Sequence, residues 1–301
     1  MLTLKQRSIL KNRVAGCVYG FVIGDAMGAT TEFMSSTQIE SKYGVLQDIV
    51  GGGWLNIQKG HATDDTEMSM CVMRALESFE DLDEVEASEM LDHKFKIECT
   101  EEFIHWLQTG PIDVGNQCRK AINFARFSVD RGQWIDDDHD ALGNGSLMRA
   151  MPCALLGRFT LNGSQSDITH PNDKVRGIVQ KYSEVIWSLL TNYMGKSTIS
   201  DIMGPQMPSE FLEPTGHIVN TFTNALLWAD KDDFESCLIG AVNDGGDADT
   251  IAAIACSMSG ARFGLAGIDA RHIAALDKQL MPELGQFINF AVAEIEKKLS
   301  K

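Results

Sequence analysis

Two short acidic segments carry the residue types in this sequence that are best suited to chemistry. Each offers two carboxylates and at least one hydroxyl and leads into an apolar stretch; they are Thr63-Asp64-Asp65-Thr66 and Asp247-Ala248-Asp249-Thr250. A helix start needs one capping oxygen, so capping leaves the second carboxylate of each segment unexplained. If the two segments meet in the fold, their carboxylates need protons or divalent cations to neutralise them. We therefore expect a metal site built from both segments.

The donor atoms of these segments favour hard cations. Carboxylate and hydroxyl oxygens suit Mg²⁺ or Mn²⁺, whereas Zn²⁺ sites usually include histidine or cysteine. The seven histidines show no HxxxH or HExxH pair. Since at least six side chains in the two segments bear oxygen ligands, we predict two divalent ions, either Mg²⁺ or Mn²⁺.

A glycine-containing segment offers a second kind of site. Gly143-Asn144-Gly145-Ser146 precedes Met148 and Arg149, and we predict that a helix runs from Ser146 to Leu156. Backbone N–H groups at such a helix start can hold a phosphate without a basic patch. The alternative is a structural glycine loop with Arg149 paired to a core carboxylate.

The net charge restricts the partners of the protein. Lys and Arg total 26 against 42 Asp and Glu, which gives a formal charge of −16. This charge repels nucleic acids and anionic membranes, so an anionic ligand would need metals or backbone amides. The seven cysteines are odd in number and widely spread, which indicates reduced thiols. With no signal peptide or membrane span in the sequence, we expect a cytoplasmic monomer without direct membrane insertion.

The elements that position these residues are predicted to be helices. Glycines at a four-residue spacing, Gly16, Gly20, Gly24 and Gly28, lie near one face of a helix predicted over residues 7–28. An interior helical glycine costs about 1 kcal/mol relative to alanine. The stripe therefore indicates that another helix approaches closely.

Helical spacing of apolar residues continues along the chain. We predict a helix over residues 64–79, with Asp64 as cap and Glu67 completing a capping box. The other predicted helices cover residues 86–109, 116–127, 146–156, 174–193, 217–229, 234–242, 249–263 and 282–299. We predict loops at residues 51–54, 136–145 and 203–215. Strand-like alternation is scarce, so the prediction is an all-α fold in one domain over residues 1–301, with a central binuclear metal cleft.

Four motifs in this order resemble the signature of the ADP-ribosylglycohydrolase family. They are Gly24-Asp25-Ala26-Met27-Gly28 with Glu32, Thr63-Asp64-Asp65-Thr66, Gly143-Asn144-Gly145 with Met148-Arg149, and Gly245-Gly246-Asp247-Ala248-Asp249-Thr250. Three further segments look most like the branch of dinitrogenase-reductase-activating glycohydrolases. They are Gly51-Gly52-Gly53-Trp54, Asp113-Val114-Gly115-Asn116 with Cys118-Arg119, and residues 234–243.

The resemblance implies an all-α fold, a binuclear Mn²⁺ or Mg²⁺ centre and a role for each matched residue. The implied metal ligands are Thr63, Asp64, Asp65, Asp247, Asp249 and Thr250, with Glu32 beside them. The implied substrate contacts are Asp113 and Asn116 near the ribose and arginine, and Gly143, Asn144, Gly145 and Ser146 around the diphosphate. His170 would line the same cleft. His217 occupies the position that looks like the family's tyrosine position.

The reaction implied is hydrolysis of the N-glycosidic bond between ADP-ribose and a modified arginine. Metals that bind the ribose hydroxyls would also lower the pKa of the attacking water. Glu32 or Asp65 would accept a proton or stabilise the oxocarbenium-like transition state. Asp113 would stabilise or protonate the leaving guanidine. The implied partner is an ADP-ribosylated protein such as dinitrogenase reductase.

Three alternatives fit parts of the same pattern. A hydrolase of this kind could counter an ADP-ribosylating toxin instead of reactivating a nitrogenase component. Two metals and a phosphate cradle also suit a phosphohydrolase acting on a nucleotide diphosphate. A non-catalytic ADP-ribose-binding module would keep the fold but lose acidic ligands, and none of the six implied metal ligands is missing here.

Overall fold

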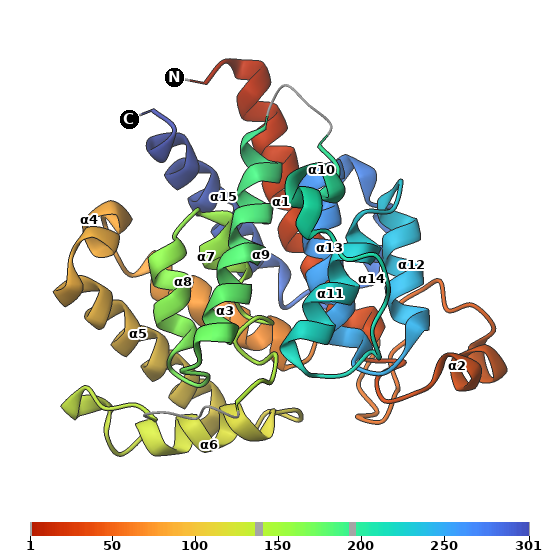
Figure 1. Cartoon of the computed structure of the whole chain (residues 1–301), viewed down its shortest axis with the longest axis horizontal. Helices are drawn as coiled ribbons and strands as arrows, with labels where there is room; N and C mark the ends of the chain where they lie inside the picture. Colours follow the sequence, from red (N-terminus) through yellow and green to blue (C-terminus); the bar gives the residue numbers. More distant parts are fainter. Residues whose placement is uncertain (1, 136–140, 193–196, 301) are drawn as a thin grey trace. The chain divides into compact units, whose positions relative to one another are not determined.

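The computed structural model of the chain describes residues 2–135, 141–192 and 197–300, and these residues form helices without a β-sheet (Figure 1). The described residues add only two isolated bridges, Ser35 with Gly245 and Gly52 with Ile57. The all-α prediction is therefore confirmed. No helix in the described ranges is both long enough and apolar enough to cross a bilayer. Five residues of the predicted 136–145 loop, 136–140, lie outside the described ranges.

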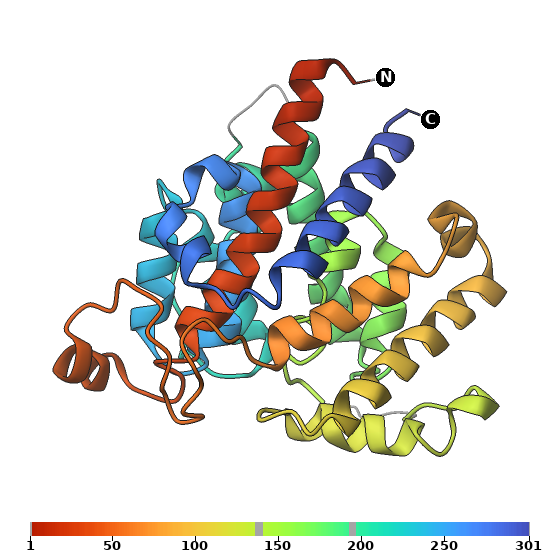
Figure 2. The same ribbon diagram turned by 180° about the vertical axis from the view of Figure 1, so that it is seen from behind.

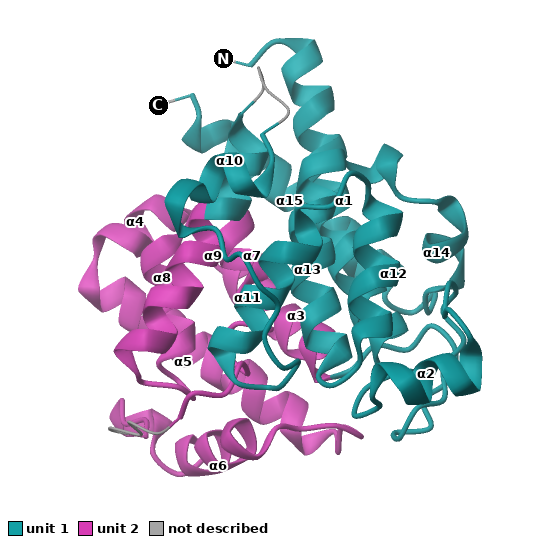
Figure 3. Ribbon diagram, turned by 45° about the vertical axis from the view of Figure 1, so that its right-hand side comes forward, with its two compact units in different colours: residues 1–63, 185–301 teal, residues 64–184 magenta. Residues whose placement is uncertain are grey.

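The chain divides into two compact units (Figure 3), Met1–Thr63 with Val185–Lys301 as unit 1 and Asp64–Glu184 as unit 2. The helices of unit 1 are α1 (Leu4–Gly28), α2 (Ser36–Tyr43), α10 (Ile199–Met203), α11 (Ile218–Ala229), α12 (Phe234–Asp244), α13 (Ala248–Phe263), α14 (Ala270–Ala275) and α15 (Met281–Lys298). Those of unit 2 are α3 (Asp64–Glu77), α4 (Leu82–Ala87), α5 (Glu89–Gln108), α6 (Asn116–Ala125), α7 (Met151–Leu155) and α8 (Phe159–Ser166). Helix α9 (Asp173–Thr191) begins in unit 2 and runs past its boundary.

The glycine stripe of α1 packs directly against the backbone of α13 in unit 1. A Cβ atom built on Gly20 would lie 2.3 Å from the carbonyl oxygen of Cys256, and one on Gly24 would lie 2.3 Å from that of Ala252. At Gly28 the added atom would be 2.5 Å from the Cα of Asp249. The close approach predicted from the stripe is thus present, and it brings the end of α1 to the start of α13.

Other helices of unit 1 surround this central pair. Helices α11 and α12 pack on α13, and α15 packs on α1. Figure 2 shows α1 and α15 running side by side, with both chain termini near one end of the pair. All but the last two residues of α13 are buried, which makes it the core helix of the unit. The acidic start of α13 therefore stands on a rigid support.

In unit 2, α5 packs against α3, α4, α6 and α8. The predicted helix over residues 86–109 is wrong at its start, because Ser88 interrupts the helical backbone between α4 and α5. The side chain of Ser88 accepts a hydrogen bond from the backbone N–H of Leu91, so it caps a new helix. A serine cap competes with continuation of the preceding helix. Here the cap forms, so α4 and α5 are separate helices.

The predicted helix over residues 146–156 is also shorter than expected. Only Met151–Leu155 is helical, because Asn144 to Met148 forms a turn in which the carbonyl oxygen of Asn144 accepts from the N–H groups of Leu147 and Met148. Helices α2, α8, α10 and α14 were not predicted from the sequence. Helix α8 contains Asn162, Gly163 and Ser164, which are weak helix formers, so tertiary packing must stabilise it.

Candidate active site

In unit 1, Asp247, Asp249 and Thr250 occupy the start of α13. A pair of glycines forms the turn before them, with φ of 81° at Gly245 and 64° at Gly246. A Cβ atom on Gly246 would lie 1.8 Å from the carbonyl oxygen of Pro214, so no larger residue fits there. The N–H of Asp247 donates to the same oxygen at 3.0 Å. The glycine pair thus holds the acidic helix start in place.

The end of α1 holds another candidate ligand, Thr63, in place through the buried carboxylate of Asp25. The backbone N–H of Thr63 donates to the two carboxylate oxygens of Asp25 at 2.9 and 3.2 Å. Asp25 is fully buried, and the sequence analysis quoted it only as part of a motif. An aspartate inside an otherwise apolar, glycine-striped helix was the signal for a positioning role.

Glu32 and Asp249 form a close pair of carboxylates in unit 1. An oxygen of Glu32 lies within 4.8 Å of an oxygen of Asp249. Burial raises the pKa of Asp249 well above its usual range, and the charges of Glu32, Asp247 and Asp25 raise it further. Oδ1 of Asp249 is buried and has no hydrogen-bond partner among the described residues. A divalent cation fits this arrangement, because it would both neutralise the charges and coordinate the unpartnered oxygen.

Trp54 also contacts Glu32, which the sequence pattern did not indicate. The indole N–H of Trp54 donates to Oε2 of Glu32, and its ring centroid lies 5.2 Å from that of Phe33. Trp54 follows three glycines with positive φ, and a Cβ atom on Gly53 would lie 2.2 Å from the carbonyl oxygen of Ala29. The predicted loop at residues 51–54 therefore has a definite task, which is to orient the indole.

In unit 2, Asp64 and Asp65 are the first two residues of α3, and both are buried. The N–H of Gly115 donates to Oδ2 of Asp64 at 3.2 Å, which brings the loop before α6 to the start of α3. Asn116 begins α6. Burial raises the pKa of Asp113, while the N–H of Val114 and the charge of Arg119 lower it in part.

The Gly143 to Ser146 segment packs against His170 and Cys118, also in unit 2. A Cβ atom on Gly145 would lie 2.7 Å from Sγ of Cys118 and 2.9 Å from Cε1 of His170, and one on Gly143 would lie 3.3 Å from Nε2 of His170. Nδ1 of His170 is 2.7 Å from the hydroxyl of Thr169. The glycines are thus needed for close packing, and the side chain of His170 is held against the loop.

Arg149 is fully buried and holds the same segment in place through hydrogen bonds. Its guanidinium donates to the carbonyl oxygen of Gly145 at 2.6 Å and to Oε1 and the backbone carbonyl of Gln165 at 2.7 and 2.8 Å. A further bond reaches the hydroxyl of Thr169 at 2.7 Å. The alternative that Arg149 pairs with a core carboxylate is therefore wrong for the described residues, and burial lowers its pKa.

His217 lies in unit 1, where it caps α11. Its Nδ1 accepts a hydrogen bond of 3.3 Å from the N–H of Val219. The structure thus distributes the candidate residues over both units. Unit 1 contains Glu32, Thr63, His217, Asp247, Asp249 and Thr250, and unit 2 contains Asp64, Asp65, Asp113, Asn116, Gly143, Asn144, Gly145, Ser146 and His170. Thr63 and Asp64 are consecutive residues at the boundary, so a peptide bond joins these two candidate ligands.

Comparison of the sequence with known proteins shows the family to which the chain belongs. The model of the ADP-ribosylglycohydrolase family matches residues 6–298, which include both units. The chain belongs to the ADP-ribosylglycohydrolase family. It is 31% identical to the ADP-ribosyl-[dinitrogen reductase] glycohydrolase of Rhodospirillum rubrum over 298 residues, covering 94% of this chain and 96% of the relative.

Two further comparisons agree with this membership. The ADP-ribosylarginine hydrolase Tri1 of Pseudomonas putida is 25% identical, with 91% of this chain and 79% of Tri1 covered. A solved structure described as an ADP-ribosylglycohydrolase-related protein complex superposes with a TM-score of 0.74 at 23% identity, covering 97% of this chain and 99% of the other. This ADP-ribosylglycohydrolase is accordingly a hydrolase that acts on ADP-ribosylated targets.

Proposed function

We propose that this ADP-ribosylglycohydrolase removes ADP-ribose from arginine side chains of proteins with the help of two divalent metal ions, Mg²⁺ or Mn²⁺. The observation that carries the proposal is the buried Oδ1 of Asp249, which lies beside the carboxylate of Glu32 and has no hydrogen-bond partner in the described part of the chain. Relatives named as acting on ADP-ribosylated dinitrogen reductase or on ADP-ribosylarginine support the arginine linkage. A protein such as dinitrogenase reductase is a suitable substrate.

The metal ligands in this proposal come from both acidic segments. They are Thr63, Asp64, Asp65, Asp247, Asp249 and Thr250. Bound cations would supply charge for orienting ribose hydroxyls and for lowering the pKa of the attacking water. Asp25 would hold Thr63 in place through the hydrogen bond to its backbone. The glycine turn at residues 245–246 would do the same for Asp247.

The remaining candidate residues bind the substrate and handle protons. Glu32 or Asp65 accepts the proton of the attacking water and stabilises positive charge on the ribose. Asp113 interacts with the departing guanidine, and its raised pKa suits a group that delivers a proton. Asn116 and His170 contact the ribose and the cleft, His217 the adenine side, and Gly143, Asn144, Gly145 and Ser146 the diphosphate.

The first test is release of ADP-ribose from an ADP-ribosylarginine peptide in Mn²⁺, in Mg²⁺ and in EDTA. We expect metal-dependent release by the wild type and loss of turnover by at least a hundredfold in Asp249→Ala, because an inner metal ligand is removed. Asp269→Ala is the matched control, since Asp269 caps α14 in the same unit and lies outside the proposed site. Circular dichroism of both variants checks that the helices are retained.

Product analysis separates this function from the alternatives. Free ADP-ribose together with unmodified arginine supports N-glycosidic hydrolysis, whereas AMP would identify a phosphohydrolase. Binding of ADP-ribose without turnover of any linkage would identify a non-catalytic module. Full activity of Asp249→Ala in EDTA would refute the metal assignment. Assays on ADP-ribosylated dinitrogenase reductase and on a toxin-modified protein would distinguish nitrogenase reactivation from a toxin-countering role.

A further inference from the structure

A small pocket in unit 2, the α5–α6 pocket, combines an apolar floor with two arginines. Its volume is about 220 Å³. Its apolar lining consists of Ile104 and Leu107 from α5 and Ile122 from α6, and Gln108 of α5 adds an amide. Three polar residues come from α6 and its C-cap: Arg119, Asn123 and Arg126. The three polar residues are four and three positions apart, so they share one face of the helix and its end. The pocket is thus lined by two positive charges, one on α6 and one on the residue that caps its C-terminus.

Both guanidinium groups are available to a ligand. In the described part of the chain, the backbone N–H groups of Arg119 and Arg126 donate to Gly115 and Ile122, but neither guanidinium forms a hydrogen bond or an ion pair. The charge of Arg119 acts only through space on Asp113. The guanidinium of Arg126 lies 5.9 Å from the ring of Phe127, whose side chain is 80% exposed. The two guanidinium groups supply local positive charge on a chain with a net charge of −16.

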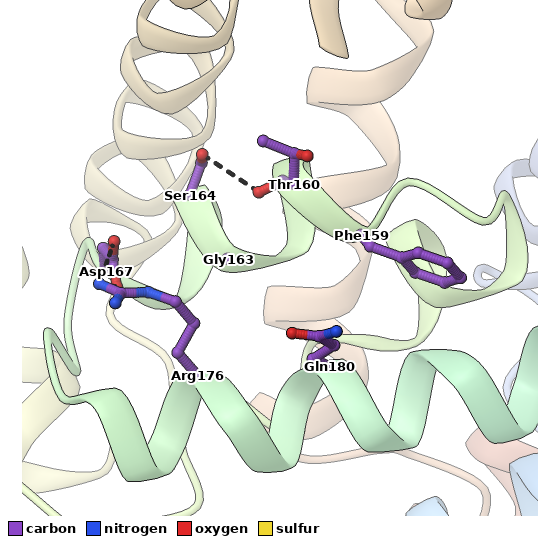
Figure 4. Close-up of a pocket in the computed structure, with 7 residues that line it drawn as sticks. All are labelled: Phe159, Thr160, Gly163, Ser164, Asp167, Arg176 and Gln180. Atoms are coloured by element: carbon purple, nitrogen blue, oxygen red, sulfur yellow. Dashed lines mark hydrogen bonds and ion pairs between the residues drawn. The ribbon is translucent and has the colours of Figure 1, made fainter.

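The pocket between α8 and α9 in the same unit gives an instructive contrast (Figure 4). Its arginine, Arg176, is already neutralised by Asp167 at 2.9 Å and by Asp173 at 2.8 Å. An anion entering that pocket would have to displace two carboxylates. The α5–α6 pocket requires no such displacement, so it is the better anion site.

We propose that the α5–α6 pocket binds acidic side chains of the protein substrate that lie near the modified arginine. This inference rests on the proposed function and names the sequence context that the enzyme prefers. Arginine forks match carboxylate geometry, and the apolar floor suits the methylene stem of glutamate. The volume is below the roughly 300–1,000 Å³ of typical small-molecule sites, which favours one or two peptide side chains over a nucleotide.

The position of the pocket on α6 sets the distance along the substrate. Helix α6 begins at Asn116, directly after the loop that carries Asp113. A rise of about 1.5 Å per residue puts Arg119 roughly 5 Å and Arg126 roughly 15 Å from that start along the helix axis. An extended peptide spans about 3.3 Å per residue. We therefore expect the recognised acidic residues within about five positions of the modified arginine.

The test compares two peptides with a single ADP-ribosylated arginine, one with glutamates and the other with glutamines at the five positions on either side. Free ADP-ribosylarginine serves as the substrate without a peptide. For the wild type we expect kcat/KM about fivefold higher for the glutamate peptide, mainly through KM, because two exposed ion pairs contribute modest binding energy. The preference should vanish at about 0.5 M salt.

Arg126→Glu should abolish or invert the preference for the glutamate peptide while leaving turnover of free ADP-ribosylarginine unchanged. Arg131→Glu is the matched control, because Arg131 is exposed in unit 2, does not line the pocket and changes the net charge equally. A wild type with equal kcat/KM for both peptides, or an equal loss in the two variants, would overturn the inference while the proposed function stands. If no substrate is cleaved, the proposed function fails; fluorescence anisotropy with the unmodified glutamate peptide then decides whether the pocket binds it and Arg126→Glu weakens it.

Discussion

At the scale of single residues, the carboxylate of Glu32 lies near a second carboxylate and accepts a hydrogen bond from an indole. Asp249 lies within 4.8 Å of it, and the indole of Trp54 donates a hydrogen bond to its Oε2. The indole hydrogen bond stabilises the ionised carboxylate, whereas the neighbouring aspartate disfavours it. A cation beside Asp249 would resolve this conflict in favour of the ionised form. Glu32 is thus oriented by Trp54 and is suited to accept a proton.

Glu32→Gln should slow hydrolysis of an ADP-ribosylarginine peptide by about a hundredfold or more, because glutamine cannot accept the proton of the attacking water. Binding of ADP-ribose should change little, since the amide preserves shape and can still contact Trp54. Single-turnover kinetics and calorimetric titration with ADP-ribose measure the two quantities separately. Unchanged turnover in Glu32→Gln would remove Glu32 from the mechanism and favour Asp65 as the base.

At the scale of elements, the packing of α1 against α13 supports the acidic groups of unit 1. Asp25 and Gly28 lie in the last turn of α1, and Asp249 lies in the first turn of α13. Because no side chain separates the two backbones at Gly20 or Gly24, the helices have little freedom to slide. This rigidity positions the candidate ligands better than loops could.

Gly20→Ala should therefore destabilise the protein by about 3 kcal/mol, because its Cβ would meet a backbone carbonyl that cannot move aside. Gly285→Ala in α15 is the matched control from the same unit, since an added Cβ meets nothing within 4 Å. That variant should be about 0.5–1 kcal/mol more stable than the wild type. Urea unfolding of both variants measures the difference. Equal stability of Gly20→Ala and wild type would contradict the close packing of α1 and α13.

At the scale of the whole molecule, the carboxylates gathered around Asp249 make the stability of the fold depend on bound protons and cations. Burial and three neighbouring carboxylates raise the pKa of Asp249. The folded metal-free protein therefore retains a proton that the unfolded chain releases above about pH 4. The stability contributed by this proton is present below the unfolded pKa and is lost as the pH rises through the folded pKa. Metal binding should replace it at neutral pH.

In EDTA, the Tm should fall as the pH rises above about 4, the ordinary pKa of an aspartate, toward the raised pKa of Asp249. Mn²⁺ at a hundredfold excess over its Kd should restore about 2.7 kcal/mol, with a larger Tm increase at the higher pH because protons compete for the same oxygens. Differential scanning fluorimetry of the wild type and Asp249→Asn measures both effects. The variant should lose much of the pH slope and of the Mn²⁺ response; an equal Mn²⁺ response in both proteins would argue against Asp249 as a ligand.

The sequence alone determined the fold class and predicted the chemical character of the candidate site. Apolar residues at helical spacing and the glycine stripe are local patterns, so α1, α3 and α13 could be predicted to within a few residues. The two acidic segments also predicted oxygen donors at helix starts, and α3 and α13 do begin there. The candidate metal chemistry follows from residue types that sequence displays directly.

Only the tertiary structure decided which side chains support these groups. Asp25 holds Thr63 across 38 positions, and Arg149 bonds Gln165 and Thr169 instead of a carboxylate. The break at Ser88 and the late start of α7 likewise follow from capping and turn contacts that compete with local propensity. Such contacts join residues distant in the chain and leave no periodic signal, because their stability depends on the surrounding packing.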